Sequence, residues 1–474
     1  MDDYSSYDAL GLAELVATRQ ASPVELLDAA IARCEAENLK LNFIAQPLYD
    51  RARAAATQPF TGPFAGVPFL VKDLHMHIAG ERSGEGSRLW DGYRPDYTST
   101  LFARFEAAGF NTFGKTTTPE LGLTVTTEST ATGLTRNPWH HDRSAGGSSG
   151  GAACAVAAGV VPVAHASDGG GSIRCPAAAC GLFGMKPSRG RVPSGPHLTE
   201  GWMGLTVNHC VSRSVRDSAA VLDAIHGIEA GSRYVAPAPE RTFLSEVGRD
   251  PGRLRVALML DAPTGVPVDR QVITATRDAA RLLESLGHHV EQAAPVLDAW
   301  ALTSAMTATV GASTALDIGN RLHDLGRDSA GDDIETVPQM WVHIGNRTTA
   351  VELAKANATF QTAAIAMAEF LTRFDVILSP VFAQPVIELG RIDLSPPDIA
   401  TWTAAITGYS PFTAIANQTG QPAMSLPLGT DRDGLPIGVM VTGRYGEEGL
   451  LYRLAAQVEA AAPWRARRPP ASQD

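Results

Sequence analysis

The chain has 474 residues, of which 44% are hydrophobic and 19% are charged, and its formal net charge is −11. This composition is ordinary for a globular protein that is long enough to bury a sizeable core. The acidic balance argues against nucleic acid as a partner, because a phosphate backbone favours basic surfaces. The N-terminus, MDDYSSYDAL, lacks the basic and apolar regions of a signal peptide, and no apolar window is long enough to span a bilayer. We therefore expect a cytoplasmic protein with no membrane partner.

The first half of the chain predicts an alternation of helices and strands. Two amphipathic helices open it, and the second begins with Ser22 as N-cap, Pro23 at the first helical position and Glu25 placed to complete a capping box. A strand rich in Val, Phe and Leu follows and ends near Lys72. The segment YTSTLFARFEAAGFNTFGKTTTPE predicts a helix, a glycine stop and a short strand. The run GGSSGG then leads into a helix of small residues, a β-rich stretch, a second glycine turn and another short helix.

The second half continues this α/β alternation. Strands are predicted at GRLRVALMLD, FDVILSP, QPAMSLPLG and GLPIGVMVTG, with helices over 270–287, 344–374 and 446–462. Because no repeat of 20–50 residues is present, a solenoid is excluded and one large layered α/β domain is expected. The five cysteines are scattered without a CxxC pair, which favours buried thiols over disulfides or a zinc site.

Two short runs, GGSSGG at 146–151 and DGGGSIR at 168–174, are candidates for a ligand-binding backbone. Gly/Ser runs are often flexible linkers, but each of these leads directly into a helix, where free N–H groups attract an anion. Neither a P-loop lysine nor a GxSxG elbow is present. A serine nucleophile here needs another base, and Lys72 in the apolar run VPFLVKDL suits that role if burial lowers its pKa from about 10.4 to near 7. An ordinary lysine near the surface is the alternative.

Lys72, the serines of GGSSGG and the serine of GGGSIR, in that order, resemble the amidase signature family. The blocks FAGVPF, GKTTTPELG, RNPW, GMKPSRGRV, DVILSP and GLPIG extend the resemblance over most of the chain. It implies a Ser–cis-Ser–Lys triad with Ser172 as nucleophile, Ser148 as bridging serine and Lys72 as base. It also implies the amidase signature fold, an α/β architecture in which a large mixed β-sheet core is covered by helices on both faces.

The resemblance implies further roles around the nucleophile. The oxyanion hole would be formed by four successive backbone N–H groups, those of Gly169, Gly170, Gly171 and Ser172. Asp168 and Arg174 resemble the buried pair that holds this loop in shape, and we interpret them as a structural ion pair without a chemical role. The three glycines stand where the family most often has Thr-Gly-Gly, which leaves the chemistry intact.

The expected organisation is one amidase domain over 1–474, with N-terminal helices over 7–40, a catalytic core over 60–230 and a variable substrate-facing helical region over 290–375. Within the family, the similarity is greatest to bacterial hydrolases of the aminohexanoate cyclic dimer. Leu123 stands where those enzymes have a polar substrate contact, so their specificity is not expected here. Met340, Trp341 and Met306 are the other candidates for substrate contact, and plain core packing is their alternative.

The resulting functional hypothesis is an amidase that cleaves the C–N bond of a small-molecule amide through an acyl-enzyme, with no cofactor and no metal. A homodimer is the oligomeric state that the resemblance suggests. The alternative is the A subunit of a tRNA-dependent amidotransferase, which would hydrolyse glutamine within a complex. The histidines of HMH at 75–77 and HHD at 140–142 are expected to face solvent or lie in loops. Glu120 and Glu128 either line the site entrance or serve as a helix cap or surface group.

Overall fold

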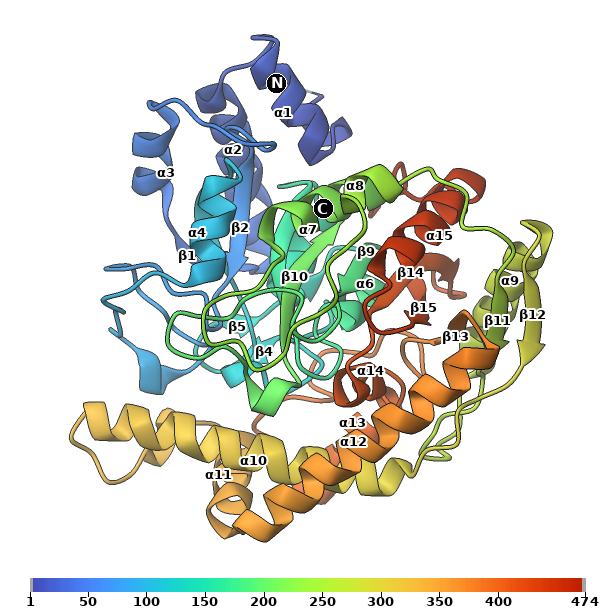
Figure 1. Ribbon diagram of the computed structural model, residues 1–474. Coiled ribbons are helices and arrows are strands. Elements are labelled where there is room, and N and C mark those ends of the chain that lie inside the picture. The colour runs from blue at the N-terminus through green and yellow to red at the C-terminus, as the bar shows by residue number, and fades with distance from the viewer. Residues whose placement is uncertain (1–2, 471–474) are drawn as a thin grey trace.

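The computed structural model describes residues 3–470, which are built around one large and one small β-sheet (Figure 1). The large sheet has the strand order β12-β11-β13-β15-β14-β9-β10-β8. The neighbours of β11 run parallel to it, whereas every other pair in this sheet is antiparallel, so the sheet is mixed as predicted. Its strands are β8 (Val163–Asp168), β9 (Phe183–Lys186), β10 (Val207–Ser212), β11 (Arg255–Leu258), β12 (His289–Gln292), β13 (Val376–Pro380), β14 (Ala423–Thr430) and β15 (Pro436–Gly443).

The small sheet carries Lys72 to the edge of the large one. It has the order β1-β3-β2, with β2 parallel to β3. Its strands are β1 (Ile44–Pro47), β2 (Pro68–Lys72) and β3 (Asn111–Thr116), and two hairpins follow as β4 (Glu128–Ser129) with β5 (Gly133–Leu134) and β6 (Arg136–Asn137) with β7 (His140–Ser144). The backbone N–H of Lys72 donates to Nδ1 of His165 on β8 at 3.2 Å. The end of β2 is therefore fixed beside the edge strand of the large sheet.

Helices cover both faces of the large sheet. On β15, a Cβ placed on Gly438 would contact Ala178 of α6, whereas one placed on Gly443 would contact Leu451 of α15. Because the two glycines are an odd number of positions apart on one strand, α6 and α15 lie on opposite faces. The helices up to α8 are α1 (Ala9–Ala17), α2 (Pro23–Leu41), α3 (Tyr49–Ala56), α4 (Thr100–Ala107), α5 (Gly150–Ala157), α6 (Arg174–Cys180), α7 (Val215–Ile225) and α8 (Phe243–Glu246). The later helices are α9 (Arg270–Ser285), α10 (Ala299–Asp324), α11 (Thr336–Arg347), α12 (Ala350–Arg373), α13 (Ile399–Tyr409), α14 (Ala414–Thr419) and α15 (Glu448–Ala461).

Short 3₁₀ turns complete the described elements. They are Tyr4–Ser6, Arg88–Trp90, Glu120–Gly122, Trp202–Gly204 and Gly331–Asp333. Figure 1 shows α10, α11 and α12 together beside the sheet core, where they form a separate helical layer. Among the helices of residues 3–470, none is long and apolar enough to cross a membrane.

Local signals in the sequence set several of these boundaries. The capping box predicted for α2 is present, since Ser22 Oγ accepts from the N–H of Glu25 at 3.2 Å and the Glu25 carboxylate accepts from the N–H of Ser22 at 2.8 Å. The single helix predicted over 344–374 is wrong, because the chain breaks between α11 and α12. Thr349 and Glu352 form a second capping box there, which begins α12 as a new helix. All five cysteines are buried free thiols, as predicted.

Candidate active site

Lys72 lies at the end of β2 and is fully buried. Its Nζ donates to Ser148 Oγ at 2.7 Å and to Ser167 Oγ at 3.0 Å. His165 and Ser167 both contact Lys72 because alternate residues of β8 face the same side. Ser167 was not among the predicted site residues, although its place on the strand before DGGGSIR was the signal that could have found it.

The surroundings of Lys72 shift its protonation equilibrium. Burial lowers the pKa of Lys72 to about 7, although the negative charges of Asp168 and Glu85 act in the opposite direction. An amine with this pKa is half neutral near pH 7 and can accept a proton. The alternative of an ordinary lysine near the surface is wrong, because the Lys72 side chain is fully buried.

Ser148 lies between Lys72 and a cavity. It follows a cis Gly147–Ser148 peptide bond and precedes α5. A methyl group placed on Gly122 would approach Ser148 Oγ to 3.2 Å, and Gly122 lines the cavity that also contains Ser172. Ser148 is thus bonded to Lys72 and lies next to Gly122, a residue of the wall of the cavity that Ser172 also lines.

The loop that carries Ser172 connects β8 to α6 and is held from inside by Asp168. The Asp168 carboxylate accepts from the N–H of Gly171 at 2.7 Å and from the N–H of Ile173 at 3.1 Å, on either side of Ser172. Gly171 has a φ of +141°, and a Cβ there would lie 2.4 Å from Thr413 Oγ1, so the position requires glycine. Because its N–H is donated to Asp168, Gly171 is not available as the oxyanion donor that was predicted.

Arg174 and Asp168 form a fully buried ion pair. Arg174 donates to both Asp168 oxygens at 2.9 Å, to the carbonyl of Thr413 at 2.7 Å and to Asn417 Oδ1 at 2.7 Å. Burial alone would raise the pKa of Asp168, but the attraction of Arg174 outweighs it and holds that pKa well below its usual range. Asn417 also donates to the Asp168 carbonyl. No spacing in the sequence connects Asn417 to a loop more than 200 residues earlier, so sequence reasoning missed it.

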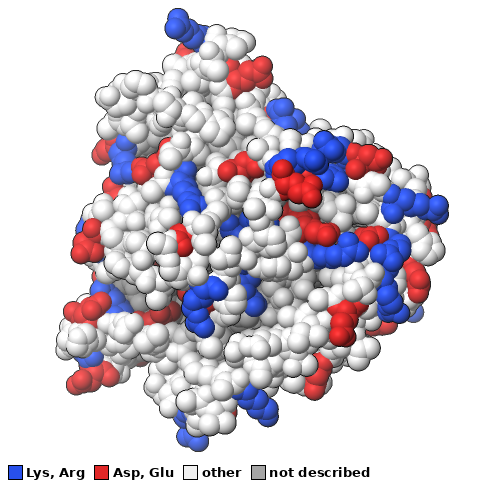
Figure 2. Space-filling view, in the orientation of Figure 1, with Lys and Arg blue, Asp and Glu red and all other residues white. Residues whose placement is uncertain are grey.

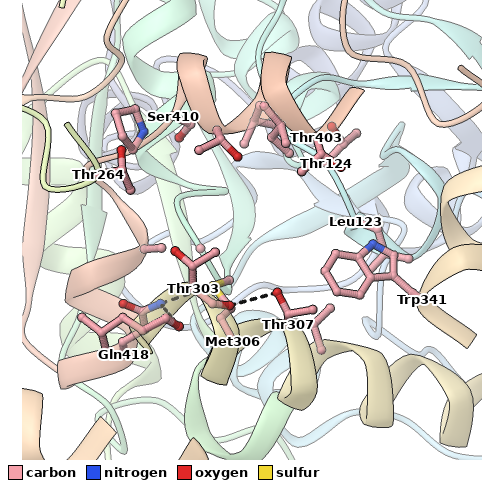
Figure 3. A pocket seen from close by; sticks show the side chains of 18 of the residues that line it. Leu123, Thr124, Thr264, Thr303, Met306, Thr307, Trp341, Thr403, Ser410 and Gln418 are labelled. Atoms are coloured by element: carbon pink, nitrogen blue, oxygen red, sulfur yellow. Dashed lines mark hydrogen bonds between the residues drawn. The ribbon is translucent and has the colours of Figure 1, made fainter. Parts of the chain in front are cut away.

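The cavity beside Ser172 has a volume of about 380 Å³. Leu123, Met306, Met340 and Trp341 all line it, so the predicted substrate-contact candidates border the same cavity. Figure 3 shows Leu123 and Trp341 on one side of the cavity and Gln418 on the other. Among the described residues that line the cavity, none carries a charged side chain. The cavity is thus suited to an uncharged and largely apolar molecule.

The segment 399–418 also lines the cavity, which the sequence analysis did not predict. Trp402 and Ile406 of α13 and Gln418 of α14 belong to the wall. The indole N–H groups of Trp402 and Trp341 have no hydrogen-bond partner in the structure, and neither has the side-chain Oε1 of Gln418. A buried polar atom without a partner costs roughly 1–3 kcal/mol. A bound molecule with matching polar groups can recover this free energy.

The predictions for two histidine pairs hold only in part. Both histidines of HMH lie on a loop, as predicted; His75 is 61% exposed, whereas His77 is only 12% exposed. In HHD, His140 is exposed and His141 half-buried, and both lie on β7 rather than in a turn.

Glu120 and Glu128 neither line the cavity nor lie at the surface. The Glu120 carboxylate accepts from the Ser87 hydroxyl and from the N–H of Glu335, and Glu128 accepts from the N–H of Gly390. Both side chains are therefore buried cross-links between loops, which rules out the surface role among the alternatives considered for them.

Comparison with known proteins places this fold and site in a class. The sequence profile of the Amidase family matches residues 25–452. The chain belongs to the amidase family and is a hydrolase that acts on amide C–N bonds.

Among its relatives, 6-aminohexanoate-cyclic-dimer hydrolase of Paenarthrobacter ureafaciens is 38% identical, with 98% of this chain and 96% of that protein covered. A solved structure of 6-aminohexanoate cyclic dimer hydrolase with its substrate has a TM-score of 0.94 at 37% identity, covering 98% of this chain and 99% of that one. A bacterial aryl acylamidase of the amidase signature family has a TM-score of 0.88 at 28% identity, covering 98% and 99%. The glutamyl-tRNA(Gln) amidotransferase protein of Thermotoga maritima that corresponds to the alternative above is more distant, with a TM-score of 0.77 at 25% identity and coverage of 97% and 96%.

Proposed function

We propose that this protein hydrolyses an uncharged carboxylic amide through an acyl-enzyme on Ser172, with Ser148 as proton relay and Lys72 as base. The observation that carries the proposal is the 2.7 Å hydrogen bond between Lys72 Nζ and Ser148 Oγ in a fully buried setting beside the Ser172 cavity. The pKa of Lys72 near 7 supports it, because a general base is most effective near the working pH.

In the acylation step, Ser172 Oγ attacks the carbonyl carbon of the amide. Ser172 gives its proton to Ser148, and Ser148 gives its own proton to neutral Lys72. The carbonyl oxygen becomes an oxyanion, which the backbone N–H groups of Gly169, Gly170 and Ser172 can stabilise by about 3–4 kcal/mol for each well-placed donor.

Expulsion of the amine reverses the proton relay. The Lys72 ammonium returns a proton through Ser148 to the leaving nitrogen, because an amide anion is too poor a leaving group to depart unprotonated. A water molecule then attacks the Ser172 ester and passes its proton along the same path. The products are a carboxylate and ammonia or an amine, and all three side chains regain their starting states.

The cavity limits the substrate class. Aromatic and aliphatic walls with no charged side chain among the described lining residues favour an uncharged acyl chain or ring. Free glutamine carries an α-ammonium and an α-carboxylate group. Among the described residues that line this cavity, none is an acidic or a basic side chain that could pair with them. Over the face in Figure 2, Lys and Arg are interspersed with Asp and Glu, without an extended basic surface of the kind tRNA favours. These observations count against the amidotransferase alternative.

The test is a hydrolysis screen of the purified chain. The panel comprises hexanamide, benzamide, an anilide, the cyclic aminohexanoate dimer and glutamine. Turnover of uncharged amides, with an ester on Ser172 detected by mass spectrometry after acid quench, is the expected result. Ser285→Ala is the matched control for Ser172→Ala, because Ser285 is an exposed serine at the end of α9. Exclusive turnover of glutamine, or labelling of a serine other than Ser172, would overturn the proposal.

A further inference from the structure

A second cluster of ionisable side chains lies on the loop that follows Lys72. His77 Nε2 is 3.2 Å from Glu85 Oε1, and His75 Nδ1 is 3.6 Å from Glu85 Oε2. One nitrogen from each imidazole and one carboxylate oxygen all lie within 4.8 Å of one another. None of the three residues lines the Ser172 cavity, so the cluster is separate from the candidate active site.

The Glu85 carboxylate is held in a fixed orientation toward the two imidazoles. Its Oε1 accepts from Ser83 Oγ at 2.9 Å, and its Oε2 accepts from the backbone N–H of His75 at 2.9 Å. Each oxygen therefore keeps a lone pair directed at an imidazole nitrogen. Glu85 is buried, so the carboxylate is positioned by the protein rather than by water.

His77 has the outer contact that metal-binding histidines usually have. Its Nδ1 is 2.5 Å from the hydroxyl of Tyr97, which leaves Nε2 as the nitrogen that faces Glu85. Contacts of this kind fix the ring orientation and the tautomer of a metal ligand. His75, by contrast, is 61% exposed, which provides a path for an ion to enter.

The backbone is also bent to bring these side chains together. His75 and Glu85 both have a φ of +52°, in the left-handed region that non-glycine residues rarely adopt. Such conformations cost on the order of 1–3 kcal/mol each and are kept where the surrounding structure requires them. Here they turn two side chains of one loop toward each other.

We propose that His75, His77 and Glu85 bind one divalent transition-metal ion, with Zn²⁺ as the best match. Two imidazoles and one carboxylate form a ligand set that Zn²⁺ accepts, with solvent in the fourth position. Both imidazoles bind as neutral groups, His75 through Nδ1 and His77 through Nε2. His77 then carries its single proton on Nδ1, where the Tyr97 oxygen accepts it, so the hydrogen bond to Tyr97 is kept with its direction reversed.

The bound ion would connect two regions of the protein. The cluster lies on the loop after β2, which carries Lys72. Asp317 on α10 is near enough that His75 and Glu85 act on it electrostatically. Because Met306 and Val310 of the same helix line the cavity, the ion would lie close to a helix of the cavity wall as well as to the lysine strand. Its role is structural, and the reaction steps above do not pass through it.

The test uses the full chain after treatment with a chelator. Titration with Zn²⁺ in a calorimeter and with Co²⁺ in a visible spectrophotometer should each give one ion per chain, with visible absorption typical of nitrogen and oxygen ligands. His77→Ala and Glu85→Gln should each weaken binding by about 100-fold or more, and Tyr97→Phe by about tenfold. His140→Ala, which removes an exposed histidine outside the cluster, should bind as the wild type does.

His75→Ala is the second variant in case His77→Ala fails to fold, because His75 is mostly exposed. Circular dichroism checks the fold of each variant, and the metal should raise the melting temperature of the wild type but not of His75→Ala. No binding in the wild type, or equal affinity in the ligand variants and in His140→Ala, would overturn the proposal. Because these readouts need no substrate, they can also be made on Ser172→Ala and do not depend on the proposed function.

Discussion

The nucleophile loop and the cavity wall meet at Ser172 but are built in opposite ways. Along the loop, Asp168 and Arg174 are fully buried, and their hydrogen bonds reach Thr413 and Asn417. The cavity wall is formed by apolar and aromatic side chains, and several of its polar atoms have no partner. The loop is thus fixed by polar contacts in one geometry, whereas the wall is completed only by a ligand.

The loop and the wall therefore control different properties, the reaction rate and the substrate preference. The rigid loop sets the position of the reacting atoms, where an error of about 1 Å can cost 100-fold in rate. The wall sets which acyl group is accepted, where single contacts change discrimination by only about 1–3 kcal/mol. Variants of the loop should therefore change kcat, and variants of the wall should change the preference among substrates.

The largest effect is expected for Ser172→Ala. Removal of the hydroxyl leaves no atom to form the acyl-enzyme, so kcat should fall by about 10⁴-fold or more while the melting temperature stays within a few degrees. Steady-state hydrolysis of the best amide in the screen measures this, with Ser285→Ala as the control for folding. Activity retained above one hundredth of the wild type would show that another group attacks the amide.

Lys72→Met should cost nearly as much. The variant keeps the buried aliphatic volume but removes the base, so kcat should fall by about 10³-fold or more. Lys186→Met is the matched control, because Lys186 is also fully buried with a pKa lowered by burial to about 7, yet its ammonium donates to the Pro187 carbonyl. Equal losses in the two variants would point to a general cost of replacing a buried lysine rather than to loss of a base.

Asp168→Asn tests the rigidity of the loop. It leaves the Arg174 charge buried without its partner, so the free energy of unfolding should fall by about 3–5 kcal/mol and kcat should fall with it. Urea denaturation followed by circular dichroism measures the first, and hydrolysis measures the second. Asp142→Asn, at an exposed position on β7, should change neither. A full-rate, fully stable Asp168→Asn protein would contradict the role of this ion pair.

The pH dependence tests the state of Lys72. Because the pKa of Lys72 is lowered to about 7, kcat/KM should rise with pH through 7, falling about tenfold for each unit below it, and should level off above. The contribution of Lys72 to the free energy of unfolding changes with pH in the same direction as the rate. Between pH 7 and 10.5 the unfolded lysine binds a proton that the folded one does not, so the contribution of Lys72 to stability rises with pH. A flat rate profile from pH 6 to 9 would exclude Lys72 as the base.

The smallest effect is expected at the cavity wall. Leu123→Ala enlarges the cavity, so KM should rise severalfold for short-chain amides. The ratio of KM for bulky amides to KM for short-chain amides should fall, and kcat should change little. Competition between hexanamide and an anilide gives the ratio directly. Leu198→Ala, at a side chain that is 69% exposed, is the control and should leave the ratio unchanged. A large fall in kcat for every substrate would mean that Leu123 positions the nucleophile instead.

Local sequence patterns predicted much of the fold because the relevant forces act over short distances. The capping box of α2 and the strands around Lys72 and FDVILSP are set by neighbouring residues, and the structure has them. The break before α12 is also local, but the apolar periodicity on both sides obscured the Thr349 cap. The strand order was beyond reach, because pairing between distant segments depends on three-dimensional packing.

The residues of the candidate site also fall into those that local sequence predicted and those that it did not. Lys72, Ser148 and Ser172 lie in short motifs, so a resemblance to known blocks was enough to select them. Asn417 and Trp402 come from segments without such a motif and reach the site only through the fold. The commitment of the Gly171 N–H to Asp168 is likewise invisible in the sequence, because it depends on the loop conformation.

The attachment of Arg174 to Thr413 and Asn417 has a consequence for redesign. These two residues bracket the first turn of α14, whose next residue Gln418 belongs to the cavity wall, so part of the wall is tied to the nucleophile loop. The α10–α12 layer makes no direct contribution to the hydrogen bonds of Arg174 described above. A library that diversifies cavity positions on α10 and α11 can therefore explore new acyl groups at small risk to turnover. Diversification of 413–417 would instead disturb the nucleophile loop, so any change in selectivity would come with a loss of activity.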